Sequence, residues 1–168
     1  MGREIRRVPP NWEHPKNDYG NYIPMHDETF DFALENYYQN YMAWKNKTHE
    51  GYSDEYSFSD YEGEPPISNC FRPEFKEEPT WYQVYETVSE GTPVTPPFET
   101  KEELVEYLVN HGTFWDERRV RDGRQDKVGW DRESAEQFAE YEWAPSGTVT
   151  REGIKTLGDK GFFPKKET

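Results

Sequence analysis

The chain has 168 residues, with 34 acidic residues against 20 basic ones and a formal net charge of −14. This length is typical of one domain, and six Trp, twelve Tyr and ten Phe supply rings for a core, which argues against a disordered chain. The sequence contains no stretch that predicts a membrane span or a secretory signal, and the charge disfavours direct binding to nucleic acid or to anionic membranes.

Residues 1–24 are expected to form an extended N-terminal arm. Three arginines in residues 3–8 precede two consecutive prolines, which prevent a continuous helix, so this stretch predicts an edge strand or an extended segment. Residues 11–24 are rich in Pro, Asn and Gly, and rings interrupt them at Trp12, Tyr19 and Tyr22. This pattern is typical of an irregular segment anchored by its rings, and we expect the arginines to pair with carboxylates of the same chain.

A first helix is predicted over residues 29–47. Apolar and ring residues recur there at steps of three and four, and either Met42 or Trp44 continues the pattern. Asp27 or Thr29 is a suitable N-cap, with acidic residues near the first turn and lysines near the last, which fits the helix dipole.

Residues 49–80 predict an acidic loop region. Residues 49–98 hold eleven acidic groups against Arg72 and Lys76, a net charge of −9. Acids alternate with rings and prolines here, so long regular elements are not expected. An acidic surface interleaved with rings favours a basic partner protein. The candidate partner-binding residues are Glu50, Tyr52, Asp54, Glu55, Tyr56, Asp60, Tyr61, Glu62 and Glu64.

Residues 81–88 combine rings with β-branched residues and predict a central strand. The Pro-rich stretch at 91–97 fits a turn, an edge or a crossover. A second helix is predicted over residues 100–111, because Thr100 and Glu103 have the spacing of a capping box and Gly112 is a suitable end.

Residues 114–127 mix both charge signs and are interpreted as an exposed connection. A third helix is predicted over residues 132–143, with Asp131 as its N-cap and an end before Pro145. Residues 147–150 are expected to add a short strand, and the tail offers Ile154 and Leu157 for packing before the basic pair Lys165 and Lys166.

These elements predict an α+β fold for a single domain over residues 1–168. A small, mainly antiparallel sheet contains the strand at 81–88 and is packed by about three helices, with extended Pro-rich arms. Strand order does not follow from the sequence.

Three blocks stand out along the chain: Arg6-Arg-Val-Pro-Pro-Asn-Trp-Glu-His-Pro15, Tyr82-Gln-Val-Tyr-Glu-Thr-Val-Ser-Glu-Gly-Thr-Pro-Val-Thr-Pro96 and Trp143-Ala-Pro-Ser146. Together they resemble a widespread family of uncharacterised tailed-phage and prophage proteins. The resemblance implies a protein made in the cytoplasm of an infected or lysogenic bacterium. It implies no catalytic residue.

No constellation in the sequence predicts chemistry. The four histidines lack the spacing of a helical zinc motif, and the chain contains no phosphate-binding loop and no nucleophile elbow. The single Cys70 cannot form an internal disulfide, which suits a reducing compartment. We therefore expect no catalytic residue, no metal and no cofactor.

The leading hypothesis is a phage-encoded acidic binding protein that docks on a basic host protein surface. It would inhibit host defence or nucleic-acid-handling machinery, by imitation of nucleic acid. One alternative is a structural or assembly factor of the virion, and another is an enzyme with an unrecognised site.

Overall fold

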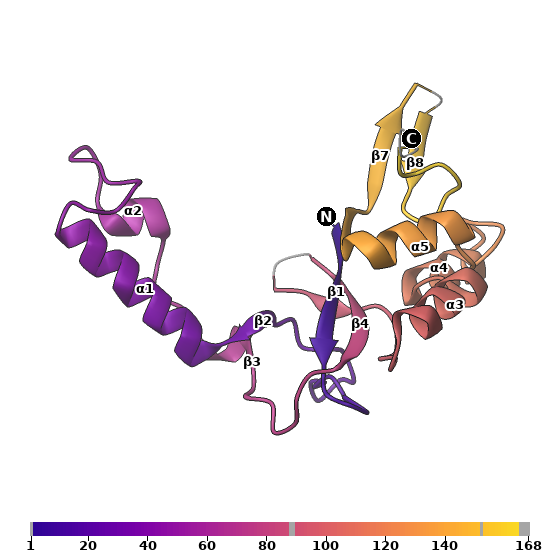
Figure 1. Ribbon diagram of the computed structural model, residues 1–168, viewed down its shortest axis with the longest axis horizontal. Coiled ribbons are helices and arrows are strands. Elements are labelled where there is room, and N and C mark those ends of the chain that lie inside the picture. Colours follow the sequence, from indigo (N-terminus) through magenta and orange to yellow (C-terminus); the bar gives the residue numbers. More distant parts are fainter. Residues whose placement is uncertain (1, 88–89, 152, 165–168) are drawn as a thin grey trace. The chain divides into compact units, whose positions relative to one another are not determined.

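The computed structural model describes residues 2–87, 90–151 and 153–164 and has an α+β fold (Figure 1). The chain forms two compact units. The sheet unit comprises Met1–Pro24 and Phe75–Thr168, and the acidic unit comprises Met25–Glu74. The single domain expected from the chain length stays a prediction.

The sheet unit is built on four strands, mainly antiparallel as predicted, in the order β5-β4-β1-β6. The register pairs Ile5 with Val84 at the centre of the sheet. The strands are β1 (Gly2–Val8), β4 (Trp81–Glu86), β5 (Thr92–Pro93) and β6 (Trp143–Pro145). The predicted strand at 81–88 is therefore present as an inner strand over residues 81–86, while Val88 lies outside the described residues.

The N-terminal strand is not an edge strand or a loose arm, which corrects the expectation for residues 1–24. Strand β1 lies between β4 and β6, and the Ile5 amide donates to the Glu142 carbonyl at 2.8 Å. Its arginines suggested an exposed strand, but Arg3 is buried and pairs with Glu86 at 3.0 Å. Arg6 is buried too and pairs with Glu4. Neutralisation by acids of the same chain, which the sequence predicted, allows a basic strand to be central.

Helices α3 (Lys101–His111) and α5 (Arg132–Tyr141) lie on one side of the sheet (Figure 1). The hydrophobic core is formed by residues of these helices and of the strands. Phe138, Leu104, Leu108 and Val84 are fully buried there. Both helices begin as predicted, α3 with the Thr100–Glu103 capping box and α5 with Asp131 accepting from the Ser134 amide.

Two boundaries in this unit differ from the predictions. Helix α5 ends at Tyr141 instead of residue 143, because Glu142 adopts a left-handed conformation and the next residues enter β6. Residues Phe114–Arg121, interpreted as part of an exposed connection, form helix α4. The prediction overlooked the Thr113–Asp116 capping box because the segment is highly charged. In this box the buried Asp116 carboxylate accepts from the Thr113 amide at 2.8 Å.

Residues 9–24 contact the other face of the sheet through Tyr85. The Trp12 indole N–H and a ring nitrogen of His14 both bond the Tyr85 hydroxyl, at 3.3 and 3.1 Å. The prediction of an irregular, ring-anchored segment is confirmed for Trp12, which also packs edge-on against Phe75. It is wrong for Tyr19, whose side chain is 89% exposed.

The C-terminal part of the sheet unit contains a hairpin of β7 (Gly147–Thr150) and β8 (Gly153–Thr156). The short strand expected at 147–150 is confirmed. Leu157 is buried as predicted, whereas Ile154 is exposed opposite Val149. Lys165 and Lys166 lie outside the described residues.

The acidic unit has one long helix, α1 (Phe30–Lys45), close to the predicted range of 29–47. Of the two proposed N-caps, Thr29 is the one whose side chain accepts from the helix, at the Phe32 amide. The shorter elements are β2 (His26–Thr29), α2 (Phe58–Glu62), the 3-10 helix η1 (Ser68–Cys70) and β3 (Phe71–Arg72). Residues 49–80 thus lack long regular elements, as expected.

Candidate functional site

The candidate partner-binding residues all lie in the acidic unit, where their rings gather around Trp44. This buried indole ends the inner face of α1, so it settles the alternative between Met42 and Trp44. Its ring centroid lies 5.2 Å from Tyr52, 6.0 Å from Tyr56 and 5.3 Å from Tyr61. His49 and Phe58 complete the set at 5.7 and 5.8 Å. We call these six residues the ring cluster.

Local backbone structure brings these rings together. After α1 the chain reverses at Lys47, which has a φ of 61°, and the amides of Thr48 and His49 return to the Ala43 carbonyl at 2.9 and 3.2 Å. Ser57 then caps helix α2, and its side chain forms a capping box with Asp60. The turn and the short helix fold the loop back over the end of α1.

Gly51 sets the position of the Tyr61 ring. A Cβ atom on residue 51 would lie 2.3 Å from the Tyr61 ring, so only glycine lets the phenol rest against the backbone. Tyr61 is parallel to Tyr56, with an interplanar angle of 7° and a centroid separation of 6.4 Å. Both remain exposed, at 45% and 43%, so the two rings combine a packed inner edge with an accessible surface.

The predicted carboxylates divide into those with internal partners and those without. Asp54 accepts from the Tyr52 hydroxyl and from the Lys47 ammonium, the latter at 3.0 Å. These two bonds lower the pKa of Asp54, and hydrogen bonding to Tyr52 and Asp54 raises the pKa of Lys47.

Asp60 is used to cap α2, where its bonds to the Ser57 side chain and amide lower its pKa. Glu62 accepts from the side-chain amide of Asn40 at 3.2 Å. Within the described residues, the carboxylates of Glu50, Glu55 and Glu64 are exposed and have no hydrogen bond or ion pair. These three acids are therefore available to a partner.

Charge is concentrated in this unit. Residues 25–74 contain eleven acidic residues against three basic ones, which leaves a net charge of −8 in 50 of the 168 residues. Two of the three cations are engaged internally, Lys47 with Asp54 and Arg72 with Asp27 at 3.7 Å. The field around the ring cluster is thus strongly negative.

Sequence reasoning missed a buried polar network in the sheet unit, beside a cavity of about 570 Å³. Tyr85 is its centre and donates to the Gln83 side chain at 3.0 Å, while Gln83 donates to the Thr95 carbonyl at 2.8 Å. His14 Nε2 lies 2.7 Å from the Ile23 carbonyl, which can only accept, so Nε2 carries a proton. No spacing in the sequence relates these residues, because only the fold joins residues 12–23 to β4.

The polar side chains of this network bond mainly to one another and to nearby carbonyl groups. Both ring nitrogens of His14 have partners, the Tyr85 hydroxyl and the Ile23 carbonyl. Burial lowers the pKa of His14; the bond to Ile23 opposes this effect and the nearby Arg6 cation adds to it. A buried histidine with a polar neighbour at each ring nitrogen favours a role in holding residues 9–24 on the sheet over one in proton transfer.

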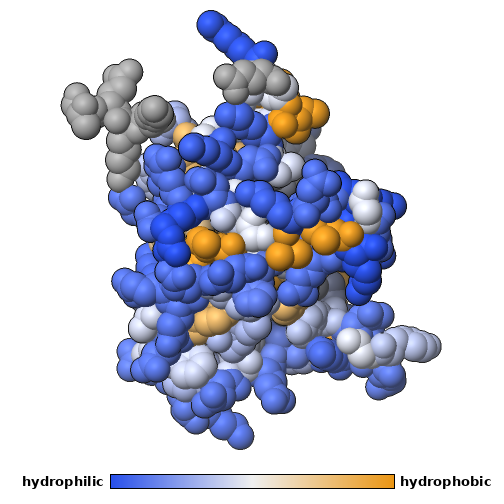
Figure 2. Space-filling model, turned by 90° about the vertical axis from the view of Figure 1, so that its right-hand side faces the viewer, coloured by the Kyte–Doolittle hydropathy of each residue, from blue (hydrophilic) through white to orange (hydrophobic). Residues whose placement is uncertain are grey.

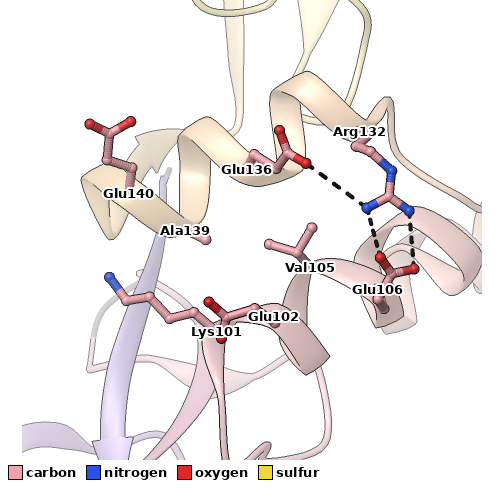
Figure 3. A pocket seen from close by; sticks show the side chains of 8 residues that line it. All are labelled: Lys101, Glu102, Val105, Glu106, Arg132, Glu136, Ala139 and Glu140. Carbon is pink, nitrogen blue, oxygen red and sulfur yellow. Dashed lines mark hydrogen bonds and ion pairs between the residues drawn. The ribbon is translucent and has the colours of Figure 1, made fainter.

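A second depression lies between α3 and α5, with a volume of about 380 Å³ (Figure 3). Its floor is Val105 and Ala139, and glutamates project from both helices around it. Arg132 makes a bidentate pair with Glu106, at 2.7 and 3.0 Å, which lowers the pKa of Glu106. Both cations that line this depression have internal partners, Arg132 with Glu106 and Lys101 with Glu142 at 2.7 Å, and its described lining residues include no exposed ring pair like that of the ring cluster.

The surface over these helices is mainly hydrophilic, and Figure 2 shows only small, separated hydrophobic patches on that face.

Among the described residues, no group of three His, Cys, Asp or Glu side chains is arranged to hold a metal ion. No helix in the described part of the chain has the length and apolar character of a membrane span. Searches of protein-family models, of curated proteins and of solved structures find nothing that matches this chain.

Proposed function

We propose that the chain is an acidic binding protein whose acidic unit docks on a basic surface of a partner protein. The observation that supports this most is the ring cluster, which holds Tyr56 and Tyr61 at the surface of a unit with a net charge of −8. The phage setting, and interference with host defence or nucleic-acid-handling machinery, are part of the same proposal.

Rings and charges contribute different parts of the binding free energy. A tyrosine fixed by packing loses little side-chain entropy on binding, so exposed rings of this kind are efficient anchors. Carboxylates without internal partners, such as Glu50 and Glu55, attract a basic surface over a distance of about one Debye length, about 8 Å at physiological salt.

Proteins that handle nucleic acids present surfaces of the required sign. Their lysines and arginines face one phosphate for about every 3.4 Å of helix axis on each strand. The acidic unit offers exposed carboxylates together with rings, and the same combination of negative groups and flat apolar faces characterises nucleic acid. Partner proteins of this class are therefore the first to test.

The test is an affinity pulldown from host lysate at low and high salt, with quantification by mass spectrometry. The wild-type chain is expected to retain proteins with basic surfaces, and retention should fall at least about tenfold between 50 and 500 mM NaCl. A Tyr56→Ala/Tyr61→Ala variant should lose them, whereas Tyr19→Ala, which removes an exposed ring of the sheet unit, should not.

The same experiment separates the alternatives. Recovery of virion proteins alone would favour the assembly factor, and a complex unchanged by salt and by the double variant would refute the proposal. A turnover assay that responds to His14→Asn, with binding intact, would instead support the enzyme hypothesis.

A further inference from the structure

The acidic unit already contains one complete cation-binding arrangement. Lys47 Nζ lies 5.2 Å from the centroid of the Tyr52 ring and 3.0 Å from Asp54 Oδ1, and the Tyr52 hydroxyl donates to the same carboxylate. A ring face and a carboxylate together hold an ammonium group here. The chain's own cation occupies this position, so it does not need a partner.

The neighbouring ring pair has no such cation. Tyr56 and Tyr61 are parallel and exposed, and among the described residues no Lys or Arg lies over either ring. Acidic residues flank both rings in the sequence, Glu55 before Tyr56 and Glu62 after Tyr61, and Glu50 precedes the glycine on which Tyr61 rests. Compared with the Lys47–Tyr52–Asp54 arrangement, this site has the rings and the carboxylates but, within the described residues, no cation.

We propose that the Tyr56–Tyr61 ring pair is the docking site for an arginine side chain of the partner protein. This inference rests on the proposed function and specifies the group that the acidic unit recognises. The guanidinium would stack on the exposed phenol faces, and Glu50 and Glu55 would supply the negative charge.

Arginine fits this site better than lysine for two physical reasons. Its planar, weakly hydrated guanidinium can stack on a ring while its edge N–H groups still donate to a carboxylate, whereas an ammonium group is compact and strongly hydrated. Both contacts occur together in the described residues: Arg7 lies 3.9 Å from the Tyr82 centroid and 2.9 Å from Glu142, and Arg6 lies over Tyr85 and pairs with Glu4.

The described lysines that contact rings lie 4.8 to 5.9 Å from the ring centroids. Lys101 is 5.9 Å from the centroid of the same Tyr82 ring, and Lys16 is 4.8 Å from Tyr22. Arg6, in contrast, lies 4.4 Å from Tyr85. The two shortest cation–ring contacts in the described residues are thus made by arginines, while Arg118, at 5.5 Å from the Trp115 centroid, lies within the range of the lysines.

The inference is tested by titrating the full chain with two peptides of equal length and charge, eight arginines and eight lysines, by isothermal titration calorimetry. We expect the arginine peptide to bind about three- to tenfold more tightly. The Tyr56→Leu/Tyr61→Leu variant should bind both peptides equally and at about the level of the lysine peptide. Tyr19→Leu should behave as wild type.

A second variant guards against misfolding of the double mutant. Gly51→Ala keeps both phenols but forces Tyr61 from its place, so the arginine preference should fall while the helical circular dichroism stays unchanged. Equal binding of both peptides by the wild type would overturn the arginine inference and leave the proposed function standing. Binding of neither peptide would overturn both.

Discussion

At the scale of single residues, one buried carboxylate joins the start of α4 to a core tryptophan of the sheet unit. Asp116 Oδ2 accepts from the Thr113 amide and hydroxyl, both at 2.8 Å, and from the Trp130 indole at 3.0 Å. Asp116 and Trp130 are only 7% and 6% exposed, so water cannot replace these bonds easily. The capping box of α4 thereby also fixes a core tryptophan.

Replacement of Asp116 by alanine should therefore destabilise the protein strongly. Three buried donors would lose their acceptor, and we expect the free energy of unfolding to fall by about 3 kcal/mol, as measured by urea denaturation. Asp122→Ala, which removes an exposed carboxylate at the end of the same helix, should change it by less than about 0.5 kcal/mol. Equal effects would show that the Asp116 network contributes little.

His14 should give stability a defined pH dependence. Its pKa is lowered in the folded chain, so the unfolded chain binds more protons once the pH falls to about 6.5. The free energy of unfolding should decrease as the pH is lowered through 6.5 and level off below the folded-state pKa. Urea melts at pH 7.5, 6.5 and 5.5 should show a flatter dependence for His14→Gln, and an unchanged slope would contradict this assignment.

At the scale of elements, the helices and strands that could be predicted from the sequence are those whose signals lie within the element itself. The capping residues Thr100 and Asp131 and the ring-rich run at 81–86 could be located because their side chains act on neighbouring backbone. Strand β1 was misjudged because its position depends on β6, about 140 residues away. In the acidic unit the candidate rings were identified, but their convergence on Trp44 depends on the turn at Lys47.

The inner position of β1 is tested by placing a proline in it. Ile5→Pro removes the amide that donates to Glu142 and disturbs the pairing with Val84, so the loss should be about 3 kcal/mol or more in thermal or urea unfolding. Ile5→Val keeps the amide and should cost only about 1 kcal/mol. A proline variant as stable as the valine variant would mean that β1 tolerates disruption as a free arm does.

At the scale of the whole molecule, charge is distributed unevenly between two compact units. The acidic unit carries −8, and the remaining −6 belongs to the sheet unit, which has more than twice as many residues. Repulsion among exposed carboxylates opposes compaction and is reduced by salt. The charge that attracts a partner is thus also a cost to folding.

We therefore expect NaCl to stabilise the free protein. Raising its concentration from about 20 to about 500 mM should increase Tm by a few degrees in differential scanning calorimetry. A triple variant, Glu50→Gln/Glu55→Gln/Glu64→Gln, should start from a higher Tm at low salt and gain less. A Tm that falls with salt would indicate that attractive ion pairs outweigh the repulsion.

The packing around Trp44 also makes the acidic unit an optical reporter. Trp44 is the single tryptophan among residues 25–74, and three tyrosines lie within 6.0 Å of its centroid. At such separations, light absorbed by the phenols is transferred to the indole, which emits in their place. The difference between the emission spectra of the wild type and Trp44→Phe therefore isolates this unit, and occupation of the Tyr56–Tyr61 face would be visible without an attached dye.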